Sequence, residues 1–280
     1  MKINRFVVVM ILAVSLSACG GSNNKSSNNN QSTVIEPTET SIAASEANAD
    51  ASSDNQAEQP AAENSTNSSG HCYNEYYPIK TGASWDYTLN SSLTGTDSFT
   101  RSILDTNDGG FTDQDAWAAG TVRTGSWSCD NGNLTTLSLG GLATVSTSEQ
   151  TFVATSQESS GITYPSPMET GASWSQQLSI SGDMVIADGM SGTATVDATQ
   201  SCTAVGEESV TVPAGTFTAM KLNCNTSIST AVDIEGMAID PMDLSSTSEM
   251  WLAKGVGMVK TVDNNEMVNS TIELSSYAIP

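Results

Sequence analysis

Polar and apolar residues alternate along much of the chain between residues 71 and 280. In residues 268–275 the large apolar side chains fall on one face of the run, and residues 194–199 alternate in the same way. A period of two is typical of a half-buried strand, and no window shows the 3.6-residue period of a helix. We therefore predict an antiparallel all-β domain. Its 210 residues are too many for one flat sheet, so we expect a curved sheet, half-barrel or sandwich-like in form.

Turn-forming residues separate the predicted strands. Asn107–Gly110 and Asp263–Asn265 lie between strand-like runs and are predicted hairpin tips. In a third turn Pro213 fixes the backbone, and Gly215 supplies a positive φ before the return strand.

An octapeptide occurs twice. Residues 78–85 read PIKTGASW and residues 167–174 read PMETGASW. Each copy places a Thr-Gly turn, with Gly82 or Gly171, before a strand that begins near a tryptophan, Trp85 or Trp174. We expect two sequence-similar halves, about 71–160 and 161–280, that share one sheet. The tryptophans are expected to fill the core rather than line a ligand groove.

The longest apolar run of the chain is at its start. Lys2 and Arg5 precede the run Phe6–Val14, which is too short to span a bilayer. The following Leu16–Cys19 resembles the lipobox of bacterial lipoproteins. The resemblance implies that residues 1–18 are a signal peptide and that Cys19 carries lipid. Gly20, in place of the aspartate that retains lipoproteins at the inner membrane, favours the outer membrane if the cell is Gram-negative.

Residues 19–70 differ sharply in composition from the rest. After Cys19 they contain no aromatic residue and are rich in Ser, Asn, Ala and Glu. Such a segment cannot bury enough apolar surface to offset the entropy of ordering it, so we expect a disordered tether. As a flexible coil it would span roughly 40 Å.

The charge balance excludes one class of partner. Removal of Lys2 and Arg5 with the signal leaves 7 basic residues against 31 acidic ones, a net charge near −24. Nucleic acid binding requires a basic surface, so we expect no nucleic acid partner. Attachment to a membrane would have to come from lipid on Cys19.

Four further cysteines are expected to form two disulfides. Cys72, Cys129, Cys202 and Cys224 are an even number in an exported chain. Three pairings are possible, and we favour Cys72 with Cys129 and Cys202 with Cys224. Zinc is the alternative, but no two cysteines have CxxC spacing and His71 is the only histidine, so we expect no metal site.

Several motifs together resemble a family of uncharacterised bacterial lipoproteins. They lie at residues 76–87 (YYPIKTGASWDY), 127–132 (WSCDNG), 210–217 (VTVPAGTF) and 255–260 (GVGMVK). The resemblance implies a β-rich domain in the cell envelope with no assigned activity or cofactor.

We find no catalytic constellation in the sequence. His71, the single candidate base, follows the tether directly. Residues 105–115 are acidic but lack the twelfth-position glutamate of an EF-hand, so we interpret them as a polar hairpin, with a weak Ca²⁺ site of another geometry left open. Glu207 and Glu208 would point to opposite faces of a strand.

Three functions are therefore compared. The leading one is a lipid-anchored, non-enzymatic β domain that binds a ligand or partner, one form being a curved sheet that holds an apolar or lipid-like ligand. The second is a structural or adhesive surface protein. The third is a hydrolase with an unfamiliar carboxylate site, which would need three or more acidic residues converging in a cleft.

Overall fold

The structure, a computed structural model, describes residues 72–138, 144–146, 151–185, 190–265 and 268–280. All the regular secondary structure in these ranges is β-strand, and no helix there is long and apolar enough to cross a bilayer. The strands in chain order are β1 (Ser84–Ser91), β2 (Gly95–Asn107), β3 (Gly110–Trp117), β4 (Val122–Asp130), β5 (Asn133–Thr136), β6 (Thr144–Ser146), β7 (Thr151–Gly161), β8 (Ser173–Val185), β9 (Ser191–Val212), β10 (Gly215–Ile234), β11 (Met237–Ala253), β12 (Gly257–Asn265) and β13 (Asn269–Ala278).

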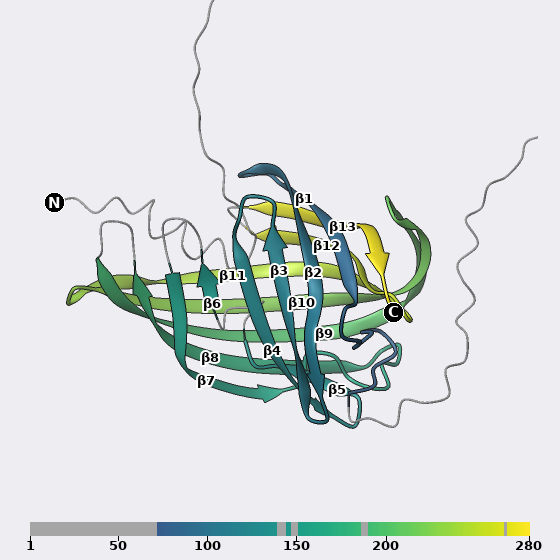
Figure 1. Ribbon diagram of the computed structural model, residues 1–280, viewed down its shortest axis with the longest axis horizontal. Coiled ribbons are helices and arrows are strands. Elements are labelled where there is room, and N and C mark those ends of the chain that lie inside the picture. Colours follow the sequence, from purple (N-terminus) through teal and green to yellow (C-terminus); the bar gives the residue numbers. More distant parts are fainter. Residues whose placement is uncertain (1–71, 139–143, 147–150, 186–189, 266–267) are drawn as a thin grey trace, which may run out of the picture.

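One antiparallel sheet contains all of these strands. Its order is β3-β2-β1-β13-β12-β11-β10-β9-β8-β7-β6-β4-β5, and an additional pairing joins β3 to β4. Because that pairing links the first strand in the order to one near its end, the sheet must curl back toward itself. Figure 1 shows β7–β11 as long curved strands, with β2, β3 and β4 crossing in front of them at a steep angle. The predicted all-β fold with a curved antiparallel sheet is confirmed.

Two of the three expected turns lie where the sequence placed them. The β2–β3 hairpin turns at Asp108 and Gly109, and the β9–β10 hairpin turns at Pro213 and Ala214. Gly215 has a φ of 139°, a value that side chains with a Cβ rarely adopt.

The third expected turn is wrong in position. Asp263–Asn265 are the last residues of β12, where Asp263 pairs with Ser270 and Asn264 with Asn269. The register of β12 with β13 therefore includes two of the three residues expected at the hairpin tip. Asn and Asp are common in turns, yet a strand pair can also hold them.

The repeated octapeptide forms the same local structure twice. Gly82 and Gly171 both have a φ of 86°, in the left-handed region that favours glycine. Their amides donate to equivalent partners, Gly82 N to Ile103 O at 3.0 Å and Gly171 N to Ala204 O at 2.8 Å. The strands that follow, β1 and β8, lie in the same sheet, and β1 pairs with β13 from the second half of the chain.

The two tryptophans of the repeat differ in burial. Trp85 is 2% exposed, and its indole N–H donates to Val256 O at 2.6 Å. Trp174 is only partly buried, and its N–H donates to Thr163 O at 2.9 Å. Both pack in or against the main hydrophobic cluster.

Two disulfides are present, with the pairing that the sequence favoured. Cys72 is bonded to Cys129, which ties the start of the described chain to β4. Cys202 and Cys224 are direct partners on β9 and β10 and are bonded to each other.

The inner face of the sheet has two different ends. The aromatic end is the larger cluster, in which β1–β4 cross the long strands. Its buried aromatic members are Tyr76, Tyr77, Trp85, Tyr87, Phe99, Phe111, Trp117, Phe217 and Trp251. The aliphatic end lies toward the other end of the long strands. It is formed by Met184, Ala194, Val196, Ala198, Ile228, Val232 and Ile234, with Phe152, Met190 and Ile239 packed against it.

Candidate functional site

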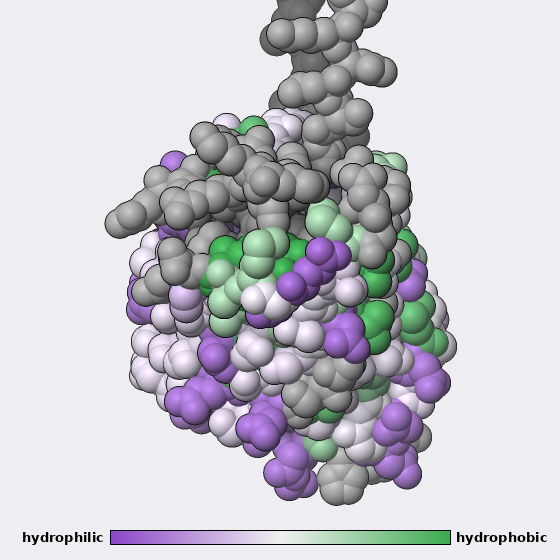
Figure 2. Space-filling model, turned by 90° about the vertical axis from the view of Figure 1, so that its left-hand side faces the viewer, coloured by the Kyte–Doolittle hydropathy of each residue, from purple (hydrophilic) through white to green (hydrophobic). Residues whose placement is uncertain are grey.

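The aliphatic end is lined mainly by small side chains. On β9 the inward residues are Ala194, Val196 and Ala198, and β10 adds Val232 and Ile234. In Figure 1 the left-hand parts of β8–β11 extend beyond the region that β2, β3 and β4 cross. Figure 2 looks at this end and shows hydrophobic residues, in green, near its centre, with polar residues mainly below them. An apolar inner surface thus continues past the strands that cover its other half.

Phe152 of β7 connects this surface to the neighbouring strands. It packs against both the aliphatic end and the adjacent pair Leu178 and Ile180. A Cβ on Gly182 would lie 2.5 Å from the ring of Phe152, so the absence of a side chain on β8 is what admits the ring. Phe152 is paired with Met184 on one side and with Val145 of β6 on the other.

Four charged residues meet on the inner face of β2, β3 and β4. Arg101 Nε lies 2.8 Å from Asp115 Oδ1, and Arg101 Nη2 lies 2.9 Å from Oδ2. Arg123 Nη2 also donates to Asp115 Oδ2, at 2.6 Å. Asp113, one pleat away, accepts a hydrogen bond from the Tyr77 hydroxyl at 3.1 Å. Asp113, Asp115 and Arg123 are each less than a tenth exposed.

Burial and charge act in opposite directions on these carboxyls. Burial alone would raise the pKa of Asp115, but the positive charges of Arg101 and Arg123 and their hydrogen bonds lower it below its usual value. Burial raises the pKa of Asp113, and the charge of Arg101 offsets this only in part. Burial opposes the charge on Arg101, but Asp115 compensates, and the pKa of Arg101 is raised. The pKa shifts therefore favour the charged forms of Arg101 and Asp115, and Asp113 is the more easily protonated of the two carboxyls.

Three buried donors beside this network have no hydrogen-bond acceptor among the described residues. They are Arg123 Nε, Trp117 Nε1 and Trp127 Nε1. The guanidinium carbon of Arg123 lies 5.5 Å from the centroid of the Trp117 ring, so the first two donors belong to one cluster. A buried donor that lacks an acceptor costs about 1–3 kcal/mol, which makes such a cluster unusual in a core.

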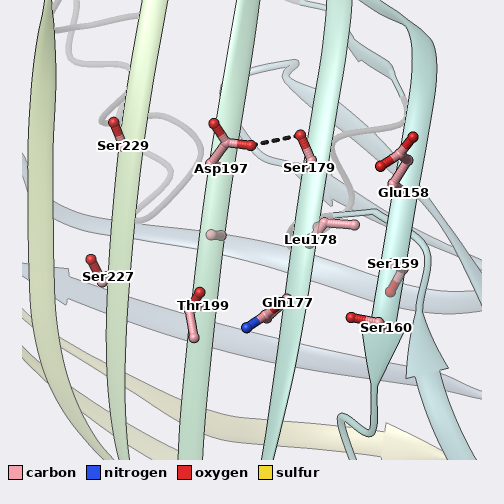
Figure 3. Close-up of a pocket in the computed structure, with 11 residues that line it drawn as sticks. Glu158, Ser159, Ser160, Gln177, Leu178, Ser179, Asp197, Thr199, Ser227 and Ser229 are labelled. Carbon is pink, nitrogen blue, oxygen red and sulfur yellow. Dashed lines mark hydrogen bonds between the residues drawn. The ribbon is translucent and has the colours of Figure 1, made fainter.

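A polar trough crosses the outer face of β7–β10. Its volume is about 600 Å³, and it holds two acidic residues, Glu158 and Asp197. Figure 3 shows Ser179 between them, and its hydroxyl donates to Asp197 Oδ1 at 2.6 Å. Leu178 and Ala198 are buried beneath the strands rather than exposed in the trough. The trough therefore lacks an apolar or aromatic anchor for a ligand, and its two carboxylates do not supply the three that the hydrolase hypothesis requires.

The acidic residues singled out in the sequence are not brought together. Glu208 accepts from Trp251 Nε1 at 2.6 Å, whereas Glu207 accepts from the Tyr76 hydroxyl at 3.2 Å and pairs with Lys254. In the acidic stretch, Asp105 and Asp108 are exposed near the hairpin, while Asp113 and Asp115 are buried. In the described part of the chain no three His, Cys, Asp or Glu side chains lie close enough to hold a metal ion. Cys19, His71 and the expected tether lie outside the described residues.

Sequence reasoning missed the buried charged network. The interpretation of residues 105–115 as a polar hairpin holds at its tip, but β3 turns the last two aspartates inward. A signal was present, because Phe111, Asp113, Asp115 and Trp117 have the same parity and so share one face of a strand. Aspartates between two aromatics on one face indicate burial with a partner, and the arginines of β2 and β4 are the available partners.

These features define a class of protein: a single curled antiparallel sheet with a filled aromatic end, an aliphatic end and a buried charged network between them. The chain belongs to the DUF3108-like family, whose model matches residues 121–277. Of the motifs noted in the sequence, those at 127–132, 210–217 and 255–260 fall within the matched range. The family carries no assigned function in its description.

Three solved structures are similar to the chain at low identity. A candidate lipoprotein of Parabacteroides distasonis ATCC 8503 is 15% identical, with 74% of this chain and 99% of the other covered and a TM-score of 0.46. A candidate exported protein with a YmcC-like fold from Bacteroides fragilis NCTC 9343 is 14% identical, with 74% and 100% covered and a TM-score of 0.45. The hypothetical lipoprotein YmcC of Escherichia coli K12 is 7% identical, with 71% and 86% covered and a TM-score of 0.36. No curated protein matches the chain.

Proposed function

We propose that this protein is a lipid-anchored, non-enzymatic binding domain of the bacterial cell envelope, and that it holds an apolar chain on the aliphatic end of its sheet. The signal-like start and the lipobox-like Leu16–Cys19 support the anchor. Residues 1–18 would be removed, residues 19–70 would act as a tether, and residues 71–280 would bind. In a Gram-negative cell, Gly20 favours the outer membrane.

One observation supports the binding function above the others. The inner face is continuous along β9 and β10, yet its aromatic half is filled by side chains of β1–β4, and its aliphatic half is lined by Ala, Val and Ile. These aliphatic side chains are each less than a tenth exposed, so a ligand chain that reached them would lie away from water. Apolar surface of this kind gains about 25 cal/mol per Å² when a ligand chain covers it.

Binding is tested with a matched pair of substitutions on one strand. Ala198 points inward and is 7% exposed, and the next residue, Thr199, lies in the outer trough. The full mature chain, residues 19–280 with Cys19→Ser so that no detergent is needed, is titrated with the neutral apolar fluorophore N-phenyl-naphthylamine. Ala198→Phe should weaken binding about tenfold or more by filling the surface, and Thr199→Phe should leave it unchanged.

Two results would count against the proposal. The first is an unmodified chain that does not enhance the fluorescence of the probe. The second is an Ala198→Phe variant that binds normally but unfolds at lower denaturant concentration, since a loss of about 1–3 kcal/mol would mean that the space is already packed.

The anchor has a separate test. Mass spectrometry of the protein from a membrane fraction should find a mature amino terminus at Cys19 with added acyl mass. An unmodified terminus, or one at another residue, would contradict lipid anchoring. Proteolysis of intact cells would then distinguish a surface-facing domain, which is released, from a periplasmic one, which is protected.

A further inference from the structure

We propose that Arg123 and Trp117 form an interior anion site that receives the acidic head group of an amphiphile whose chain lies on the aliphatic end. This inference rests on the proposed function and names the ligand class, a single-chain amphiphile with a carboxylate or phosphate group.

The first support is the pair of donors that lack an acceptor. Arg123 is 8% exposed and Trp117 is 6% exposed, and both belong to the inner face of the sheet. Arg123 uses Nη2 for Asp115, which leaves Nε directed elsewhere with no acceptor in the described chain. An acceptor oxygen of a ligand would satisfy Nε, and a second would satisfy Trp117 Nε1. Hydrogen bonds from a charged donor to a charged acceptor are about twice as strong as neutral ones.

The second support is the position of this site relative to the aliphatic end. Register pairs Arg123 with Val145 of β6, Val145 with Phe152 of β7, and Phe152 with Met184 of β8. Direct partners in an antiparallel sheet project from the same face, and strands lie about 4.8 Å apart. Arg123 is therefore roughly 10 Å from Phe152 along the inner face. A head group at Arg123 and a chain on Phe152 and its neighbours would belong to one extended molecule.

The third support is the local charge. Two guanidinium groups share Asp115, and the remaining carboxyl, Asp113, is engaged by the Tyr77 hydroxyl. The outside of this protein repels anions, since the mature chain carries a net charge near −24. Both described arginines are nevertheless turned inward, where an anion would meet them away from water.

The experiment compares three amphiphiles of one chain length on the full mature chain with Cys19→Ser. Dodecanoic acid, dodecyl phosphate and dodecanol each displace N-phenyl-naphthylamine. We expect at least one of the two anions to bind about tenfold or more tightly than the alcohol. Preference for the carboxylate would indicate a free fatty acid, and preference for the phosphate would indicate a phospholipid-type head group. Either preference supports the site.

Two conservative variants locate the preference. Arg123→Lys keeps a cation for Asp115 but removes Nε, and Trp117→Phe keeps a ring but removes Nε1. Each should reduce anion binding severalfold and leave dodecanol binding unchanged. Lys254→Gln, which removes a cation from the outer surface, is the control and should alter neither.

The outcomes separate this inference from the function on which it rests. If the alcohol and both anions bind equally, the anion site is wrong and the apolar binding surface stands. If the anion preference survives in both variants, the site lies elsewhere and the inference is overturned. If none of the probes binds, the proposed function fails and the anion site fails with it.

Discussion

The two ends of the inner face are built from the same long strands but differ in the side chains that face them. Along β10, Leu222 and Cys224 belong to the aromatic end, and Ile228 and Val232 belong to the aliphatic end, all on one face. β9 changes in the same way between Ala198 and Cys202. What differs is the set of strands that face β9 and β10, because β1–β4 place large aromatic side chains against the aromatic end alone. The comparison teaches that a uniform alternating pattern can form both a filled core and an aliphatic lining.

The largest effect is expected at the aromatic end. Trp85→Ala should lower the free energy of unfolding by about 4 kcal/mol, because a fully buried side chain and its hydrogen bond to Val256 O are lost. Trp174→Ala, at the equivalent position of the repeat, should cost about half as much because Trp174 is only partly buried. Urea unfolding followed by circular dichroism measures both. Equal losses of unfolding free energy would show that the two tryptophans stabilise the fold equally despite their different burial.

The second-largest loss of stability is expected in the charged network of Arg101, Asp115 and Arg123. Asp115→Asn should cost about 3 kcal/mol at pH 7, because Arg101 and Arg123 are left without their shared anion. The pKa of Asp115 is lowered on folding, so the wild-type chain has this stability above about pH 4 and loses it as the pH falls. The difference between the two proteins should therefore shrink in acid. Asp105→Asn, an exposed residue on the adjacent strand, is the control and should change little. A small loss for Asp115→Asn at pH 7 would mean that the arginines find another anion.

A smaller effect of opposite sign, a gain in stability, is expected when Asp263 of β12 is replaced. Burial raises the pKa of Asp263 to about 6, with a hydrogen bond from Ser270 opposing the shift. The folded state therefore binds this proton more tightly than the unfolded state, and stability falls as the pH rises from about 4 to about 6. Asp263→Asn should add about 1–2 kcal/mol at pH 7.5 and almost nothing at pH 4.

Asp86 is the control for that prediction, because its pKa is shifted in the opposite direction. Hydrogen bonds from Ser276 and Thr100 lower its pKa, so Asp86→Asn should reduce stability at neutral pH. Thermal unfolding at the two pH values reads out both variants. A pH-independent effect of Asp263→Asn would contradict the assigned titration.

The smallest effect concerns a hydroxyl at the aliphatic end. Thr230 is 1% exposed, and its Oγ1 has no hydrogen-bond partner among the described residues. Thr230→Val keeps the shape of the side chain and should stabilise the protein by about 1 kcal/mol. Thr226→Val is the control, because Thr226 Oγ1 accepts from Gln200 Nε2 at 3.3 Å and its loss should destabilise. Destabilisation by Thr230→Val would show that the hydroxyl has a partner in solution.

Much of the fold could be predicted because its signals are local. The alternation in 194–199 and 268–275 predicted strands, and residues 194–199 and 269–275 lie in strands. Pro213 and Gly215 predicted a hairpin, and Gly215 has the expected positive φ. The repeated Gly82 and Gly171 turns have the same backbone conformation. The Asp263–Asn265 turn was misplaced, since turn propensity cannot reveal that Asp263 and Asn264 pair with β13.

The candidate site could be predicted far less well. Nothing in the linear sequence states that Arg101 and Arg123, 22 residues apart, would both meet Asp115. Their meeting depends on β2, β3 and β4 being adjacent and in a particular register, which is fixed by hairpins and by the curl of the sheet. The aliphatic end is still harder to predict from the sequence. It differs from the aromatic end in that β1–β4 do not cross it, and this depends on the tertiary structure.

The sequence by itself determined that this chain would form antiparallel strands, with two disulfides among four cysteines, because strand alternation and cysteine chemistry act over short range. Only the tertiary structure decided which inward residues are covered by aromatics, which remain an aliphatic lining, and which charges are buried together. The reason is that an alternating strand specifies which side chains face inward, while the curl of the whole sheet specifies what lies opposite them.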